Sequence, residues 1–103
     1  MGIADCRIIQ LPKISDVRGH LTFIETANHI PFKIARVYYM YDVPQGSERA
    51  GHAHKALNQL LIAVSGSFKI SVDDGKDKKT FWLSKPSEGL YLDSMVWREM
   101  SEF

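Results

Sequence analysis

Short stretches of alternating apolar and polar residues run along the chain, and most of them end at a turn signal. Residues 68–72 alternate and stop at Asp73-Asp74-Gly75, and residues 79–83 return from that turn, which predicts a β-hairpin. Residues 34–43 are dense in aromatic and β-branched side chains, which favour strands. Other strands are expected over residues 6–11, 21–25, 60–64, 90–92 and 95–100.

The spacing of these strands indicates the class of fold. Turn residues recur about every ten positions, and no segment keeps the roughly 3.6-residue period of an amphipathic helix. A chain of 103 residues can build one modest core but not two. Together these features predict a single all-β domain, a jelly-roll β-barrel whose mouth suits a small ligand.

Charge, hydropathy and cysteine content limit the expected partners and location of the protein. The net charge is +1, which gives no reason to expect nucleic acid or a membrane as a partner. No run approaches the roughly 18 apolar residues that a membrane span requires. Cys6 is the sole cysteine, so a disulfide framework is excluded and a reducing, cytoplasmic location is expected.

Paired histidines precede the apolar run of residues 60–64. His52 and His54 are two positions apart, so on an extended strand both imidazoles project from the same face. Gln59 follows, and the next residues read as a central strand that closes at a turn. One wall of the core is therefore expected to carry polar groups toward a pocket. A surface or structural pair of histidines is the alternative interpretation.

Residues 46–66 resemble the first motif of the cupin superfamily. The motif positions are Gly46, His52, His54, Gln59 and Gly66, separated by five, one, four and six residues. Metal-binding cupins have a glutamate where this chain has Gln59, and a third histidine where it has Arg98. An amide is a poor ligand for a divalent cation, and arginine cannot coordinate one. The resemblance therefore implies a site that holds no metal and no other cofactor.

At a finer level the chain resembles the dTDP-sugar 3,4-ketoisomerases, a family of metal-independent cupins. The resemblance is carried by residues 16–19, 31–39, 49–55 with Gln59, 73–75, 89–91 and 96–97. The family usually has Arg-Gly-x-His before the second histidine, whereas this chain has Arg49-Ala50-Gly51-His52. Family members generally continue beyond this length, so the single cupin-like domain of residues 1–103 is expected to lack the last strand and a C-terminal helical segment.

The resemblance implies an isomerisation of a nucleotide sugar. It moves the keto group of dTDP-4-keto-6-deoxyglucose from C4 to C3 through an enediolate, toward the deoxyamino sugars of lipopolysaccharide and S-layer glycans. A histidine suits removal of the acidified C3 hydrogen, because its ordinary pKa is close to neutrality. By carry-over from the family motif, His52 is the candidate base, His54 orients or shuttles a proton, and Tyr38 is the candidate acid near C4.

Cationic and aromatic side chains are the candidates for binding the nucleotide. The cations expected at the diphosphate are Arg18, Arg36, Arg49, Lys55 and Arg98. Guanidinium groups suit phosphate oxygens, although each cation could equally be a solvated or structural one. Gln59 is expected to contact the substrate beside them, and Trp97 could stack on the thymine ring, although an aromatic side chain in a barrel is more often core.

Three other functions share parts of this pattern. A non-catalytic nucleotide-sugar-binding cupin would need the barrel and the cations but no His-x-His pair. A metal-dependent isomerase or dioxygenase is opposed by Gln59 and Arg98, and a dTDP-sugar 3,5-epimerase matches the ketoisomerase segments less well. The expected partner is the nucleotide sugar, and pairing through edge strands makes a homodimer the expected assembly.

Overall fold

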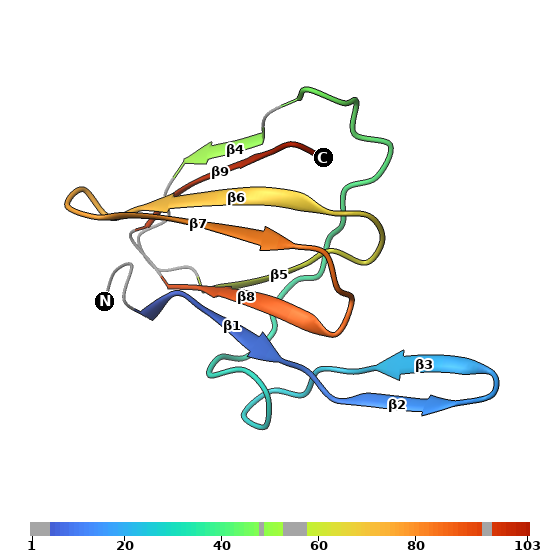
Figure 1. The fold of residues 1–103 in the computed structure, drawn as a ribbon. Coiled ribbons are helices and arrows are strands. Elements are labelled where there is room, and N and C mark those ends of the chain that lie inside the picture. Colours follow the sequence, from blue (N-terminus) through green and yellow to red (C-terminus); the bar gives the residue numbers. More distant parts are fainter. Residues whose placement is uncertain (1–4, 48, 53–57, 94–95) are drawn as a thin grey trace.

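A computed structural model describes residues 5–47, 49–52, 58–93 and 96–103, with the backbone alone for residues 49–52 (Figure 1). The strands are β1 (Arg7–Gln10), β2 (Lys13–Asp16), β3 (Gly19–Thr22), β4 (Arg49–His52), β5 (Gln59–Ile62), β6 (Phe68–Asp73), β7 (Lys78–Leu83), β8 (Glu88–Leu92) and β9 (Trp97–Ser101). None of the described residues forms a helix that could cross a membrane.

Two antiparallel sheets face each other across the core (Figure 1). One sheet has the order β1-β8-β5 and the other has the order β4-β9-β6-β7, while β2 and β3 form a separate hairpin. The core comprises Cys6, Ala63, Ile70, Val72, Leu83, Leu90, Leu92, Val96 and Met100. Its residues come from strands of both sheets and from positions directly next to them, so an apolar face of each sheet is removed from water. The all-β jelly-roll class expected from the sequence is confirmed.

The β6–β7 hairpin follows the predicted pattern closely. Phe68 pairs with Leu83 and Asp73 pairs with Lys78, so the predicted stretches 68–72 and 79–83 form one ladder. In the turn, the backbone N–H of Gly75 donates to the Asp73 carboxylate at 2.7 Å, and Gly75 adopts a φ of 93° that favours glycine. Local turn chemistry thus fixes the register of the hairpin.

Strand β8 lies in the middle of its sheet and contains a close approach at Gly89. A Cβ atom at position 89 would lie 2.7 Å from Cδ1 of Leu60 and 2.9 Å from its Cγ, on the neighbouring strand β5. No real Cβ tolerates such distances, so the Leu60 side chain can lie over the sheet only because residue 89 lacks a side chain.

Residues 34–43 are not a strand in the structure, and this prediction was wrong. No strand is assigned between β3 and residue 48, although the chain there is rich in strand-favouring residues. Strand propensity measures how well a side chain fits a pleated, half-buried surface. A segment with high propensity still needs a neighbouring strand to which its backbone can hydrogen-bond. Val37, Tyr39 and Tyr41 are instead exposed.

Smaller differences concern the neighbours of this segment. The strand expected over residues 21–25 begins and ends earlier, as β3, and pairs with β2 through a tight Val17-Arg18 turn. The run after Gln59 forms β5 at the edge of its sheet, with β8 as its one neighbour among the described strands, and is not a central strand. An edge strand with one face packed on the core can be as hydrophobic as a central strand, so hydrophobic content alone does not distinguish the two.

Candidate active site

Backbone pairing places the backbone of His52 opposite Arg98 at the edge of the second sheet. Strand β4 runs antiparallel to β9, and His52 pairs with Arg98 in the ladder. The side chains of Arg49 and His52, and all of His54 and Lys55, lie outside the described part of the structure. Their proposed roles therefore stay predictions, and the site is built here from the residues around them.

Arg98 is a buried cation on β9. It is 2% exposed, because β9 alternates and turns Arg98 and Met100 inward while Trp97 and Glu99 face outward. Its Nη2 donates to the carbonyl oxygen of Val96 at 3.2 Å, and its Nη1 donates to Oε1 of Gln59. Burial lowers the pKa of the guanidinium, and charge interactions with Cys6 and Tyr38 oppose that effect. Arginine stays protonated in proteins, so the core wall carries a positive charge here.

Gln59 connects this cation to the candidate acid. It begins β5 and is partly buried. Its Nε2 donates to the hydroxyl oxygen of Tyr38 at 3.3 Å, while its Oε1 accepts from Arg98. One amide thus joins side chains from three separate segments, β9, β5 and the stretch around residue 38.

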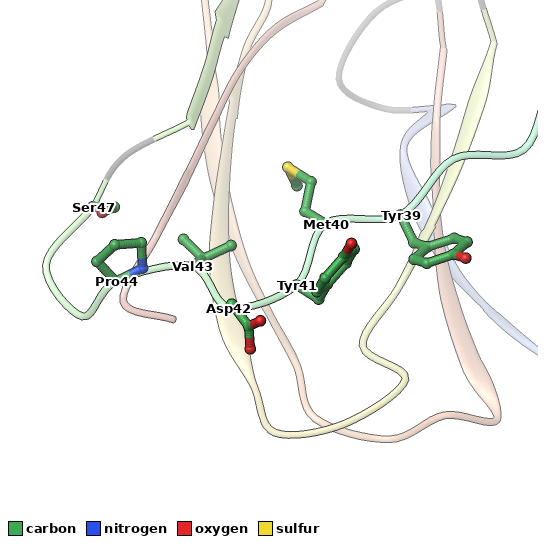
Figure 2. Close-up of a pocket in the computed structure, with 7 residues that line it drawn as sticks. All are labelled: Tyr39, Met40, Tyr41, Asp42, Val43, Pro44 and Ser47. Atoms are coloured by element: carbon green, nitrogen blue, oxygen red, sulfur yellow. The ribbon is translucent and has the colours of Figure 1, made fainter.

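Tyr38 lies on the segment that forms no strand, and 61% of it is exposed. The guanidinium carbon of Arg36 lies 5.4 Å from the centre of its ring, within the range of a cation–π contact. Met40 packs against the core, and Tyr39 and Tyr41 extend to the other side of the backbone (Figure 2).

A shallow cavity of about 400 Å³ lies next to this stretch (Figure 2). Its walls are residues 39–44 and Ser47, which belong to one continuous segment. Neither Tyr38, Gln59 nor Arg98 lines it. The cavity and the hydrogen-bonded group are therefore separate features.

Two other expected binding residues lie away from Gln59. Arg18 is in the turn of the β2–β3 hairpin, which extends beyond the two larger sheets (Figure 1), and it contacts Asp16 at 2.7 Å. Hydrogen bonds from Arg18 lower the pKa of the Asp16 carboxyl. Trp97 is on the outer face of β9 and donates from Nε1 to Glu99 at 3.3 Å. The structure thus groups Tyr38, Gln59, Arg98 and Arg36, and does not bring Arg18 or Trp97 to them.

The contact between Gln59 and Arg98 was not expected from the sequence. The sequence indicates that both residues replace metal ligands of other cupins, but it predicts no contact between them. The signal that could have joined them is chemical complementarity, since an amide oxygen accepts the hydrogen bond that a buried guanidinium must make. No group of three or more His, Cys, Asp or Glu side chains suited to a metal ion occurs within the described ranges.

Comparison with known proteins identifies the family. Residues 4–103 match the family model FdtA, described as WxcM-like, C-terminal. A TDP-4-oxo-6-deoxy-alpha-D-glucose-3,4-oxoisomerase from Aneurinibacillus thermoaerophilus is 42% identical over 97 residues, which are 94% of this chain and 70% of that protein.

Solved structures agree with this match. The 3,4-ketoisomerase QdtA from Thermoanaerobacterium thermosaccharolyticum, as a histidine-to-asparagine variant in complex with TDP-4-keto-6-deoxyglucose, superimposes with a TM-score of 0.94 at 42% identity, over 98% of this chain and 73% of that chain. The TDP-quinovose 3,4-ketoisomerase WlaRB from Campylobacter jejuni gives a TM-score of 0.94 at 44% identity, over 98% and 78% of the two chains. The chain therefore belongs to the dTDP-sugar 3,4-ketoisomerase family of cupin-type proteins.

Proposed function

We propose that this protein is an isomerase that converts dTDP-4-keto-6-deoxyglucose into its 3-keto isomer. The observation that carries the proposal is the 42% identity, over 94% of the chain, to an oxoisomerase of that sugar nucleotide. A binding module without catalysis would not require the hydroxyl of Tyr38 to be linked through Gln59 to Arg98, the residue that pairs with His52. An epimerase is not favoured either, because the similar solved structures named above are ketoisomerases.

The proposed reaction moves one carbon-bound hydrogen from C3 to C4. The C4 carbonyl acidifies the C3 hydrogen, and His52 removes it as a proton, so that its electron pair forms the enediolate. The proton on the C3 oxygen moves to the C4 oxygen, and Tyr38 donates a proton to the C4 carbon, which leaves the carbonyl at C3. The protonated His52 then returns the proton taken from C3 to the Tyr38 phenolate. His54 orients His52 or relays the protons between them. Donors placed in advance stabilise the enediolate charge, and the buried cation Arg98 is one source of that field.

The diphosphate and base of the nucleotide require further contacts. We assign the phosphate oxygens to cations from the set Arg18, Arg36, Arg49, Lys55 and Arg98, with Gln59 and Trp97 completing the binding residues. Arg36 has the strongest support as a phosphate ligand among the described cations, because it is exposed and lies directly beside Tyr38. Arg98 is already committed to Gln59 and Val96 inside the wall.

The setting of the enzyme is proposed as well. We expect one cupin-like domain over residues 1–103, a homodimer, a cytoplasmic location, a site without metal, and a place in the synthesis of lipopolysaccharide or S-layer deoxysugars. The exposed apolar side chains Ile14, Val17 and Leu21 on the β2–β3 hairpin support association with a second chain. Light scattering should then give about twice the 11.7 kDa mass of one chain, whereas a monomer mass would contradict the homodimer.

Proton NMR of the purified protein with dTDP-4-keto-6-deoxyglucose tests the function directly. A 3-keto sugar is expected as the product. An epimer, line broadening without conversion, or an unchanged spectrum would each contradict the proposal, and the first two would point to an epimerase and to a binding module.

The role of His52 is tested in deuterated solvent. The wild type should exchange the C3 hydrogen for deuterium, and His52→Ala should abolish that exchange while the nucleotide sugar still binds. Persistence of exchange in the variant would show that another group is the base.

Elemental analysis of protein purified without a histidine tag should find no stoichiometric metal, and a bound metal that disappears in His52→Ala would contradict the metal-free site.

A further inference from the structure

The orientation of the Gln59 amide is determined by its neighbours. A guanidinium has donors only, so the Gln59 atom that faces Nη1 of Arg98 must be the carbonyl oxygen Oε1. The amide nitrogen Nε2 must then face the hydroxyl of Tyr38, 3.3 Å away. The usual ambiguity between amide oxygen and nitrogen is removed here by the chemistry of the arginine.

This orientation decides which way the Tyr38 proton points. The phenolic oxygen accepts the N–H of Gln59, so its own O–H is not used toward Gln59 and is directed elsewhere. The oxygen also gains a donor that stabilises the negative charge developing on it as its proton leaves. The hydroxyl of Tyr38, a residue that is 61% exposed, is thus oriented by the partly buried side chain of Gln59.

We propose that Gln59 is a positioning residue that aims the Tyr38 proton at the substrate, with Arg98 as the anchor of its amide. The inference rests on the proposed function, because it assigns a role within that reaction. It explains why this cupin position suits glutamine and not an acid. An ionised glutamate would pair with Arg98 equally well but has acceptors only, so it would draw the Tyr38 O–H toward itself.

Other charged groups face Tyr38 in the described part of the chain. Arg36 stacks on its ring at 5.4 Å, and Arg98 acts on its oxygen through Gln59 and by charge. Neither of them sets the direction of the O–H bond, because the ring contact of Arg36 does not involve the hydroxyl and Arg98 is separated from it by the amide. Removing Gln59 should therefore remove the orientation and leave both cations in place.

The test compares two rates on the same protein sample. In the proposed reaction Tyr38 acts after His52 has taken the C3 proton, so exchange at C3 can proceed without a well-aimed Tyr38. Gln59→Met keeps the length of the side chain and removes both hydrogen bonds. It should lower 3-keto product formation by about 30-fold, less than loss of a general acid itself, and should change C3 exchange by less than about threefold.

The ratio of exchange to product formation separates positioning from a structural role. That ratio should rise about tenfold or more in Gln59→Met. An equal fall of both rates would overturn the proposal, because a disturbed fold or a lost substrate contact slows both steps. Unchanged rates would also overturn it. The matched control is Gln10→Met on β1, where the amide donates to Glu88 at 2.8 Å on the surface, and it should leave both rates unchanged.

A second variant covers the case in which Gln59→Met fails to fold. Gln59→Glu is nearly isosteric and keeps the contact with Arg98, so folding should be retained. Product formation should fall at least as far as in Gln59→Met while exchange persists, and full activity in Gln59→Glu would overturn the proposal. Failure of the proposed function itself looks different, since the wild type would then form no 3-keto product.

Discussion

Arg98 and Gln59 lie on strands that are hydrogen-bonded into the two sheets, whereas Tyr38 and Arg36 lie on a segment that forms no strand. The first pair is positioned by the fold, because register and alternation fix where the side chains of β9 and β5 point. The second pair is positioned by a few side-chain contacts, namely the Gln59 hydrogen bond and the stacking of Arg36.

The difference suits the chemistry of each pair. A buried cation needs a rigid wall that supplies its hydrogen bonds, since an unpaired charge in the core is strongly destabilising. A proton donor must meet a substrate that enters and leaves, so its side chain has to stay accessible. The amide of Gln59 is where the buried and the accessible parts of the site meet.

The largest expected effect is a loss of unfolding free energy that is large for a mutation in the sheets and small for one in residues 34–43. Leu90 on β8 is fully buried, so Leu90→Ala should lower the free energy of unfolding by about 3 kcal/mol through lost burial and a cavity. Val37 is 77% exposed, so Val37→Ala should stay within about 0.5 kcal/mol. Urea denaturation measures both. A comparable loss in the two variants would show that residues 33–43 are packed as tightly as the sheets.

Loss of the Tyr38 hydroxyl should affect rate and not stability. Tyr38→Phe should slow isomerisation by about 100-fold, the size expected for a missing general acid, with little change in KM or in the unfolding free energy. Tyr39→Phe is the matched control, because Tyr39 lines the separate cavity, which Tyr38 does not. A Tyr38→Phe enzyme with the wild-type rate would remove Tyr38 from the mechanism.

Removal of the buried cation Arg98 should lower activity without lowering stability. Arg98→Met leaves the Gln59 amide without its anchor, so product formation should fall about tenfold. The unfolding free energy should be unchanged or higher, since a buried charge costs desolvation and an apolar side chain of similar volume does not. Arg7→Met, at an exposed arginine, should change neither quantity. A loss of several kcal/mol in Arg98→Met would make Arg98 chiefly a structural residue.

The smallest expected effect is a pH dependence of the unfolding free energy that comes from the buried Cys6 thiol. Burial raises the pKa of the Cys6 thiol, and the nearby Asp93 carboxylate adds to it, against a backbone hydrogen bond that lowers it. A raised pKa means that the folded state holds the proton more tightly, so this stabilisation is complete below the unfolded-state value of about 8.5 and is lost as the pH rises above it.

Comparing the wild type with Cys6→Ala isolates this contribution. Urea titrations at about pH 7 and about pH 9.5 should show a steeper alkaline loss of stability in the wild type than in the variant. Burial also raises the pKa of the Tyr91 phenol, and that contribution is present in both proteins. Equal slopes in the two proteins would mean that the thiol ionises as readily in the folded chain as in the unfolded one.

Local patterns in the sequence predicted the parts of the fold that are locally determined. Alternation and an Asp-Asp-Gly turn were sufficient for the β6–β7 hairpin, because its partners are adjacent in the chain. Residues 34–43 have the same strand-favouring composition without a described ladder partner, and the prediction failed there. A ladder depends on which other segment lies alongside, and composition does not contain that information.

The candidate site shows the same division. Tyr38, Gln59 and Arg98 were each selected from the sequence, yet their joining through one amide depends on β5 and β9 belonging to facing sheets. Arg18 was expected at the nucleotide because it belongs to the family motif, and the structure places it in a hairpin turn paired with Asp16. Motif spacing identified the residue types, and only the sheet arrangement determined which of them meet.

A position without any side chain also governs this site. Leu60 directly follows Gln59 on β5 and occupies the space that a methyl group on residue 89 would need. Gly89→Ala would force the Leu60 side chain to move, on the strand that begins with Gln59. The packing of β5 next to Gln59 thus depends on residue 89 of β8 carrying a hydrogen atom in place of a side chain.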